Sequence, residues 1–572
     1  MKRLFSAFLA FFLAAAVAVI LIALPFQRPP APLDFPSVLP PSPLVYLESQ
    51  DFLGQLQRWN TSPAKRDWLS SANYRQFLSS RLLLRLNDKL TQFNSLLGLT
   101  IDLPLVQSLA GSRAGLALYD IGELEFVFIT QVPSPAFEQG TFFSKRPQFE
   151  QRSAGNGNYL VKSGQGQQLA FALQDGYFLL ATSERLLRTT LYNLANPNST
   201  ERLNLDSEFS RSTSLLERQT DLWMFLNLDR LNRSRYFHNE WLYGRSPKLS
   251  RLRVGAVRIT LGESRFLEER RFTEEEESGS AAPSSSNLDK SLLRSIPSQV
   301  EFVNIETASP DQLAEQLYST LISPLRPRDQ ALPFFEAPDY AVAPLLKTDN
   351  VYFQRIDTPL SEAPDSQPDT PRAIRVRRLS NALSAGGIIS LARCESPVEN
   401  DQGYHLSRRA FIFPAQPSAV VTLKRTLADL WNELYYATKP AVWASTGNGV
   451  ETLGPLSPLS LAQSDGRVYV GNSEPYLASI LKDTGGVPSD VDSVPLERYA
   501  RVNLDSWRSH ALPLFRWLDY QEQPPPEGAP PPYFSENLGS LLAALSPIQA
   551  VTARTWTQDK LVAQQVVYEL HP

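Results

Sequence analysis

The feature that most constrains the fold is a short pattern that occurs twice in the chain, 290 positions apart. Residues 169–184 and 459–474 are identical at six of sixteen positions without a gap. Each copy has two apolar runs separated by Asp-Gly and followed by Ser-Glu. Asp-Gly favours a tight hairpin because Gly tolerates positive φ, and Ser is a good helix N-cap. We therefore predict strand, turn, strand and helix in each copy.

Other segments recur in the same order and extend this repeat. Three pairs share a predicted structure: residues 222–229 with 499–505, 44–59 with 302–321, and 254–272 with 550–570. In the first pair, a strand runs into Asp229 or Asp505, which can cap the following helix. The loops between these segments differ in length. The order indicates an internal duplication.

The apolar pattern predicts an α+β fold with two related halves, largely antiparallel sheets and short helices. Hairpin patterns outnumber strand–helix–strand units, which favours antiparallel pairing. The longest helical pattern covers Asp67–Leu97 and ends at Gly98, a suitable residue after a helix. The chain has one cysteine, Cys394, and so cannot form an internal disulfide. Its stability must come from core packing.

The N-terminal part contains an apolar run, Leu4–Phe26, preceded by Lys2 and Arg3. A helix of this length spans about 34 Å, enough for a hydrocarbon core of ~30 Å. Positive charge before the run favours an N-terminus inside the cell and an exported bulk. We predict a single-pass transmembrane signal-anchor, with the bulk facing the periplasm or the cell exterior.

A cleaved signal peptide is the alternative to a retained anchor. Cleavage at the small residues Ala14-Ala15-Ala16 would leave the apolar residues 19–24 at the mature N-terminus, which favours the anchor. No cysteine lies directly after the run, so a lipid-modified N-terminus is excluded. Whether the segment is cleaved stays open at this point.

Composition shifts divide the chain into segments. The glutamate- and serine-rich stretch around residues 274–286 is typical of a linker, as is the proline-rich exit from the anchor. The predicted segments are a cytoplasmic N-terminus (1–3), the anchor (4–26), a proline-rich linker (27–43), a first α+β unit (44–272), an acidic and serine-rich linker (273–297), and a second unit (298–572) with insertions near 323–418 and 519–533.

Residue patterns that carry chemistry are sparse. The chain has four histidines and a net charge of −4, which predicts no metal site, no cofactor and no nucleic-acid partner. No nucleophile-elbow or phosphate-loop motif occurs. Asp229 and Asp505 could act as a carboxylate pair, although helix capping explains both. The sequence leaves enzymatic activity open and favours its absence, with no catalytic residue assigned.

A basic stretch follows the predicted anchor and is the one candidate binding site. Arg81, Arg85 and Lys89 are spaced by four and share one helical face. Such a ridge could rest on anionic lipid headgroups, with each cation contributing on the order of 1 kcal/mol. A solvated helix face is the ordinary alternative.

Three segments, residues 44–59, 71–75 and 117–126, carry a resemblance to other proteins, which is concentrated in residues 40–195. They resemble uncharacterised bacterial single-anchor envelope proteins, a family described only as a domain of unknown function. It implies a bacterial origin and an extracytoplasmic location. It implies no activity and no site residues.

Three functional hypotheses follow. The leading one is a membrane-anchored periplasmic protein with a structural or protein-interaction role, whose partners are the membrane and envelope proteins or lipid. The first alternative is a periplasmic carrier for lipid or another apolar ligand, which needs a continuous apolar cavity. The second is a hydrolase whose Ser, His and Asp side chains are dispersed along the sequence.

Overall fold

The structure is a computed structural model. It describes residues 32–79, 81–132, 137–154, 157–164, 166–214, 216–233, 252–274, 288–297, 300–322, 370–398, 406–435, 439–446, 448–454, 458–483, 496–519, 532–558 and 561–571. Within these ranges no helix has the length and apolar character needed to cross a membrane. The predicted anchor, residues 4–26, lies outside them.

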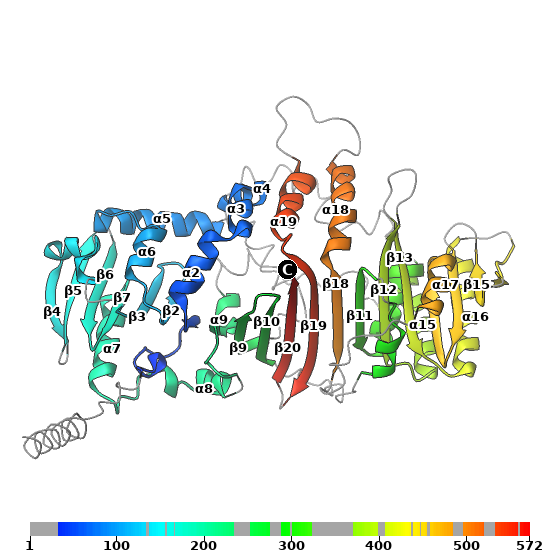
Figure 1. The fold of residues 1–572 in the computed structure, drawn as a ribbon. Coiled ribbons are helices and arrows are strands. Elements are labelled where there is room, and N and C mark those ends of the chain that lie inside the picture. Colours follow the sequence, from blue (N-terminus) through cyan, green and yellow to red (C-terminus); the bar gives the residue numbers. More distant parts are fainter. Residues whose placement is uncertain are drawn as a thin grey trace, which may run out of the picture.

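The described strands form one 20-stranded antiparallel sheet that runs the length of the molecule (Figure 1). Its first ten strands lie in the order β4–β5–β6–β7–β3–β2–β1–β8–β9–β10. Their bounds are β1 Val45–Ser49, β2 Ala114–Asp120, β3 Glu125–Gln131, β4 Glu150–Ala154, β5 Gly157–Gly164, β6 Gln167–Gln174, β7 Tyr177–Ala181, β8 Leu222–Asn227, β9 Leu252–Leu261 and β10 Arg265–Glu274.

The second ten strands continue the sheet in the order β20–β19–β18–β11–β12–β13–β17–β16–β15–β14. Their bounds are β11 Phe302–Thr307, β12 Ser390–Val398, β13 Leu406–Pro414, β14 Ala444–Ser445, β15 Val450–Leu453, β16 Leu459–Ser464, β17 Arg467–Gly471, β18 Arg498–Asn503, β19 Ile548–Gln558 and β20 Leu561–Leu570. Counted outward from the middle, the two sets have the same order. The region 323–418, expected as an insertion, contains β12 and β13.

The two halves meet where β10 pairs with β20. This antiparallel pairing runs from Arg265 opposite Glu569 to Thr273 opposite Leu561. The predicted α+β class with antiparallel pairing is confirmed. The two halves share one continuous sheet, however, where the sequence suggested a sheet in each half.

Side chains alternate between the two faces of the sheet, so each half has a core on both faces. In β6, Phe171 packs with α5 (Arg81–Leu97) on one face, whereas Ala170 and Ala172 pack with α7 (Glu184–Ala195) on the other. In the second half, α17 (Glu474–Lys482) lies on one core. The other core packs against α11 (Pro310–Leu317), the π-helix η8 (Tyr318–Ile322), α15 (Pro371–Ala385) and α16 (Pro417–Tyr435).

Both predicted hairpins are present. Asp175 and Gly176 have φ of 52° and 80°, and Asp465 and Gly466 have φ of 50° and 70°. Each pair forms a two-residue turn, between β6 and β7 and between β16 and β17. Positive φ at both central residues is the geometry that the twist of a hairpin requires. The predicted helices follow as α7 and α17.

Helix caps differ in part from those expected. Ser473 caps α17 by accepting a hydrogen bond from the Tyr476 N–H, whereas Ser183 makes no side-chain cap bond at α7. Asp229 and Asp505 lie inside the first turns of α9 (Leu228–Arg233) and α18 (Leu504–Asp519). The acceptors at those two starts are the amides Asn227 Oδ1 and Asn503 Oδ1, two residues earlier in each half.

The long helical pattern at residues 67–97 is divided into pieces. The first half has α2 (Phe52–Thr61), α3 (Pro63–Ser70), α4 (Ala72–Leu78) and α5 in succession, then α6 (Leu103–Leu109). Ser62 and Ser71 each accept a backbone hydrogen bond as the N-cap of the next helix, which ends the preceding one. Gly98, with φ of 63°, follows α5 as predicted.

The remaining helical segments are short. They are η1 (Phe35–Ser37), η2 (Phe137–Gln139), η3 (Phe143–Gln148), η4 (Leu203–Leu205), α8 (Ser207–Thr213), η7 (Lys290–Ser295), η13 (Tyr533–Leu538) and α19 (Gly539–Ala544). Two of them precede corresponding strands, since η1 comes before β1 and η7 comes before β11. They therefore occupy matching places in the two halves.

Candidate functional site

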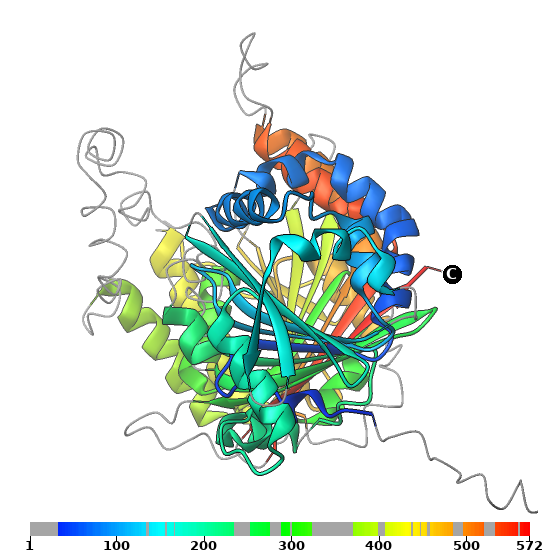
Figure 2. The same ribbon diagram turned by 90° about the vertical axis from the view of Figure 1, so that its left-hand side faces the viewer.

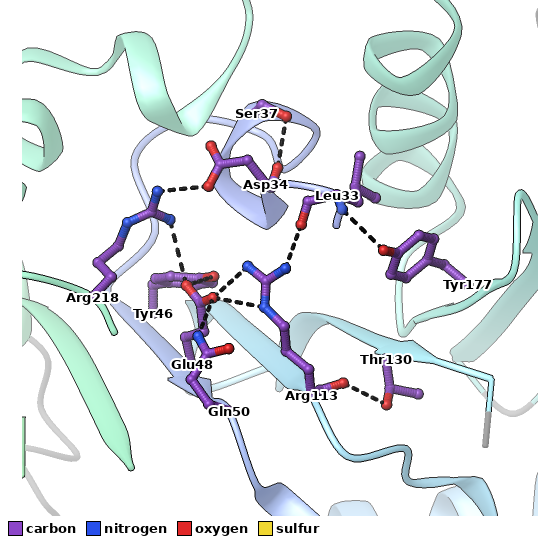
Figure 3. Close-up of polar contacts among 10 residues, drawn as sticks. All are labelled: Leu33, Asp34, Ser37, Tyr46, Glu48, Gln50, Arg113, Thr130, Tyr177 and Arg218. Carbon is purple, nitrogen blue, oxygen red and sulfur yellow. Dashed lines mark hydrogen bonds and ion pairs between the residues drawn. The ribbon is translucent and has the colours of Figure 1, made fainter. Parts of the chain in front are cut away.

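A buried carboxylate, Glu48 in β1, lies at the centre of a polar cluster in the first half (Figure 3). Its side chain is 1% exposed. Glu48 Oε1 accepts hydrogen bonds from Arg113 Nη2 at 2.6 Å and Arg113 Nε at 3.1 Å. Glu48 Oε2 accepts from the Tyr46 hydroxyl at 2.9 Å and from Arg218 Nη1 at 3.4 Å. Two guanidinium groups therefore balance a charge that burial alone would disfavour.

The same arginines hold the segment that precedes η1. Arg218 Nη2 lies 2.6 Å from Asp34 Oδ1, and Arg113 Nη1 donates to the Leu33 carbonyl at 2.7 Å. The Leu33 N–H donates to the Tyr177 hydroxyl at 2.9 Å. We call Asp34, Glu48, Arg113 and Arg218 the Glu48 cluster. It attaches the start of the described chain to the sheet.

Aromatic packing reinforces the attachment. The Arg113 guanidinium lies 4.2 Å from the centre of the Phe35 ring, and Phe35 is fully buried. A Cβ on Gly115 would come within 2.9 Å of that ring, so glycine allows the close approach. Burial and the neighbouring Glu48 carboxylate raise the pKa of Tyr46 well above its usual value. Tyr46 therefore stays a neutral hydrogen-bond donor to Glu48, and the fixed ion pairs of the Glu48 cluster suit a structural attachment.

The predicted basic ridge is only partly a surface feature. The Lys89 side chain is 3% exposed, and its Nζ lies 2.5 Å from Glu123 Oε2. Arg85 donates to the Gly122 carbonyl at 3.1 Å and pairs with Glu123 at 3.4 Å. The Lys89 hydrogen bond is the main cause that lowers the pKa of the Glu123 carboxyl. The Arg81 side chain lies outside the described residues.

These contacts change the expectation for that ridge. Lys89 points inward from α5 to the β2–β3 turn, because the sheet supplies an acidic partner that the helix spacing does not reveal. Arg85 and Lys89 share that one carboxylate, so they do not form an open row of cations. Contact of these three residues with a membrane stays an untested prediction.

A second surface feature is a layer of helices at one end of the strands, along the length of the sheet. We call it the helical crest; it consists of α2, α3, α4, α5, α18, η13 and α19. Figures 1 and 2 show helices of both halves side by side there, beyond the ends of the strands. The Asn73 N–H donates to Ser540 Oγ at 3.0 Å, and Asn73 Nδ2 donates to Asn537 Oδ1 at 2.8 Å. Helices from the two halves are therefore in contact.

The crest carries exposed aromatic and aliphatic side chains. None of the residues in α2, α3 and α4 is buried. Large apolar side chains that are exposed on the crest are Trp59, Leu69, Phe77, Leu84, Leu90, Trp507 and Tyr533. They make up half of the large exposed apolar residues found in the described ranges. Their concentration on one layer marks it as a candidate interaction surface.

Ring contacts and hydrogen bonds order the crest from within. The Trp68 ring lies 4.9 Å from that of Tyr74 and 5.8 Å from that of Phe77. Asp519 in α18 accepts hydrogen bonds from the N–H groups of Phe534 and Ser535 in η13. Partial burial opposes ionisation of Asp519, but these hydrogen bonds outweigh it and lower the pKa of the carboxyl. The helices that carry the exposed side chains are therefore held in place by these contacts.

The described histidines do not form a serine-hydrolase arrangement. Ser509 Oγ, the Ser506 carbonyl and Glu301 Oε2 lie 3.1, 2.7 and 3.8 Å from His510 Nδ1. A catalytic triad places the nucleophile and the acid on different ring nitrogens. His571 Nε2 contacts Asp505, which also pairs with Arg508. Within the described ranges no three His, Cys, Asp or Glu residues are grouped as metal ligands.

The sequence located the cations near the crest, but neither the exposed aromatic residues near them nor the buried Glu48. Arg58, Lys65, Arg66 and Arg75 belong to the basic stretch seen in the sequence. The aromatic residues Trp59 and Phe77, which lie near these cations in the sequence, were not recognised as exposed. Glu48 gave no signal, because a single Glu at the end of an apolar run looks like a strand terminus.

Comparisons with known proteins give little further identification. No family model and no curated protein matches the chain. Crystal structures of TP0453 are distantly similar: form III has a TM-score of 0.27 and 11% identity over 44% of this chain and 84% of that one. Form I has a TM-score of 0.25 and 12% identity over 44% and 82%. No family is assigned, and similarity this distant carries no functional argument.

Proposed function

We propose that this chain is a membrane-anchored, extracytoplasmic bacterial protein with a structural or protein-interaction role. The observation that carries the proposal is the Glu48 cluster, which attaches Leu33 and Asp34 to the sheet. Only six residues separate Leu33 from the end of the apolar run at Phe26. Fully extended, they reach at most about 21 Å. A bilayer that holds the apolar run would therefore lie close to the segment of Leu33 and Asp34.

The sheet itself supports a structural role. We propose that the two halves arose by internal duplication, since their strands follow one order from the centre outward. Pairing of β10 with β20 joins them through nine residue pairs. A continuous ladder of backbone hydrogen bonds resists bending better than two domains on a linker. The chain would thus present a long, stiff surface at a fixed place relative to the membrane.

Membrane fractionation and cysteine labelling test the location. The one native cysteine, Cys394, is fully buried, so a new cysteine can be labelled selectively. Val442 is 76% exposed and suits the change Val442→Cys. We expect the full chain to stay with membranes at high salt. We also expect Val442→Cys to react with an impermeant maleimide while the cytoplasmic membrane is intact.

Two results would contradict the proposal. Labelling of Val442→Cys only after cell lysis would place the bulk in the cytoplasm. Release of the full-length chain from membranes by salt would show that residues 4–26 do not anchor it. The unmodified chain, with Cys394 alone, provides the background for labelling.

A further inference from the structure

Each of the three crest helices α2, α3 and α4 carries one exposed large apolar side chain and an arginine nearby in the sequence. Arg58 precedes Trp59, Arg66 lies three residues before Leu69, and Arg75 lies two residues before Phe77. Trp59, Leu69 and Phe77 are 46%, 40% and 43% exposed. The arginines are also exposed, Arg58 by 58% and Arg66 by 77%. Three successive helices therefore each carry one exposed apolar group and one exposed arginine, and in α3 the two are three residues apart and share a helical face.

This pattern fits a lipid surface in two respects. Interfacial helices bury Trp, Phe and Leu at the boundary between headgroups and acyl chains, while Lys and Arg extend into the headgroups. Trp in particular favours this boundary. The exposed groups here are distributed one to a helix, whereas the energy of a protein interface is concentrated in a few packed anchor residues.

The charge of this part of the crest is complementary to anionic headgroups. From Asp51, the N-cap of α2, to residue 79 there are four cations, Arg58, Lys65, Arg66 and Arg75, and two acidic residues, Asp51 and Asp67, which pair with Arg58 and Arg66. The chain as a whole has a net charge of −4, so the cations are a local feature. A bilayer with anionic lipid would attract this layer even though the whole chain is acidic.

We infer that the α2–α4 part of the crest binds the surface of an anionic bilayer, with Trp59, Leu69 and Phe77 inserted and Arg58, Arg66 and Arg75 on headgroups. The inference rests on the proposed membrane association and adds a second contact with lipid. It concerns different residues from the predicted ridge on α5, where Lys89 is buried. In Figures 1 and 2 the crest lies at one end of the strands and η1 at the other. The proposed contact of the crest with lipid is therefore separate from the predicted anchor, residues 4–26.

Fluorescence of a labelled crest residue tests the inference. The full chain with Phe77→Cys, labelled with an environment-sensitive dye, is placed in phosphatidylcholine nanodiscs and titrated with vesicles. We expect a blue shift with vesicles that contain phosphatidylglycerol, little change with pure phosphatidylcholine, and weaker binding at high salt. The same dye at Val442→Cys, away from the crest, should not respond.

Charge reversal identifies the residues responsible. Three cations at about 1 kcal/mol each correspond to roughly 100-fold in affinity, so Arg58→Glu, Arg66→Glu and Arg75→Glu together should weaken vesicle binding by at least that factor. The matched control reverses three exposed arginines on α7 and α9, Arg185, Arg188 and Arg233. The control should bind as the parent does. Circular dichroism checks that both triple variants fold.

Several outcomes would overturn the inference. They are no spectral shift with phosphatidylglycerol vesicles, an equal loss of binding in the control, or a parent-like affinity in the folded crest variant. Failure of the chain to stay in nanodiscs is a different result, since it contradicts the anchor. The free chain can then be titrated with the same vesicles, which still tests the crest.

Discussion

The two halves share a strand order but fill the same central position with opposite chemistry. β1 and β11 correspond through their pairing with β8 and β18, which end at the matched caps Asn227 and Asn503. In that register Glu48 occupies the place of Ile305. Glu48 is bound by two arginines, whereas Ile305 is fully buried in an apolar core.

The difference follows from what each position holds in place. In the first half Glu48 and its arginines retain the segment of Leu33 and Asp34, whose backbone and carboxylate need polar partners. In the second half η7 packs Leu292 and Leu293 into the core that contains Ile305. An incoming segment can thus be held by charge or by apolar burial on the same scaffold.

The helices that follow these strands differ in a similar way. After β11, α11 and α15 bury leucines against the sheet, such as Leu313 and Leu379. After β1, α2, α3 and α4 contain no buried residue and leave aromatic side chains exposed, whereas α5 packs on the sheet through Phe93 and Leu97. Helices that pack on the sheet serve its core, whereas helices beyond its edge are available for contacts with other molecules.

The largest effect is expected from Glu48→Gln. It leaves Arg113 and Arg218 without a carboxylate in a buried site, which should lower the free energy of unfolding of the first half by about 3 kcal/mol. Hydrogen exchange should rise at residues 33–49. The control Glu150→Gln makes the same chemical change in an exposed pair and should have little effect. Equal responses would show that the Glu48 cluster is not an attachment.

The matched helix caps come next. Asn503→Ala should destabilise α18 by about 1 kcal/mol, the usual cost of a lost N-cap. Asn227→Ala should cost more, about 2 kcal/mol, because Asn227 is buried and its amide also donates to Glu208. Chemical denaturation measures both. An effect in only one half would show that the two caps are not equivalent.

The two Asp-Gly turns should respond alike. Gly176→Ala and Gly466→Ala force alanine to adopt positive φ, at a cost of about 1 kcal/mol each. Neither added methyl group meets another atom within 4 Å, so only the backbone term acts. Thermal unfolding measures the loss. Asp175→Asn serves as the control, because asparagine tolerates that conformation.

The smallest effects concern pH, and the two halves should show opposite signs. Burial raises the pKa of Glu301, an effect that His510 partly offsets, so the folded state retains a proton that the unfolded state loses. Stability contributed by Glu301 falls as pH rises from about 4.3, the unfolded pKa. Glu301→Gln should remove that fall. The difference in free energy of unfolding between the variant and the parent should therefore favour the variant more at neutral pH than at pH 4.

Glu184 in the first half should behave in the reverse sense. A hydrogen bond from Tyr159, followed by Arg152, lowers the pKa of its carboxyl. Stability from Glu184 is present above the unfolded pKa and is lost as pH falls through the folded pKa. Glu184→Gln should lower the free energy of unfolding at pH 7 and should have little effect in acid. The same direction of change in both variants would contradict this assignment.

Features encoded within a few residues were predicted well. The Asp-Gly turns, the helices after them, the closing strand pairs and the end of α5 at Gly98 all appear as expected. The caps at α9 and α18 were assigned to Asp229 and Asp505, although Asn227 and Asn503 make them. Both residue types suit that role, so only the position of the first turn separates them.

Features that depend on distant partners were not predicted. Matching residues 44–59 with 302–321 from their first residues sets Glu48 beside Glu306, one position away from the register that the sheet pairs define. A shift of one residue moves a side chain to the opposite face, so Glu306 lies with Gln316 and Arg498 on the other side. For the same reason the spacing of Arg81, Arg85 and Lys89 gave one helical face but not its direction.

The sequence by itself determined the α+β class, the repeated hairpins and the chemical character of the crest residues. These depend on φ preferences, side-chain period and residue type, which act over a few positions. Tertiary structure alone decided that β10 and β20 join the halves into one sheet, that Lys89 turns inward, and that Trp59 and Phe77 stay exposed. Each of these depends on backbone pairing and packing between segments far apart in the chain, which local patterns do not contain.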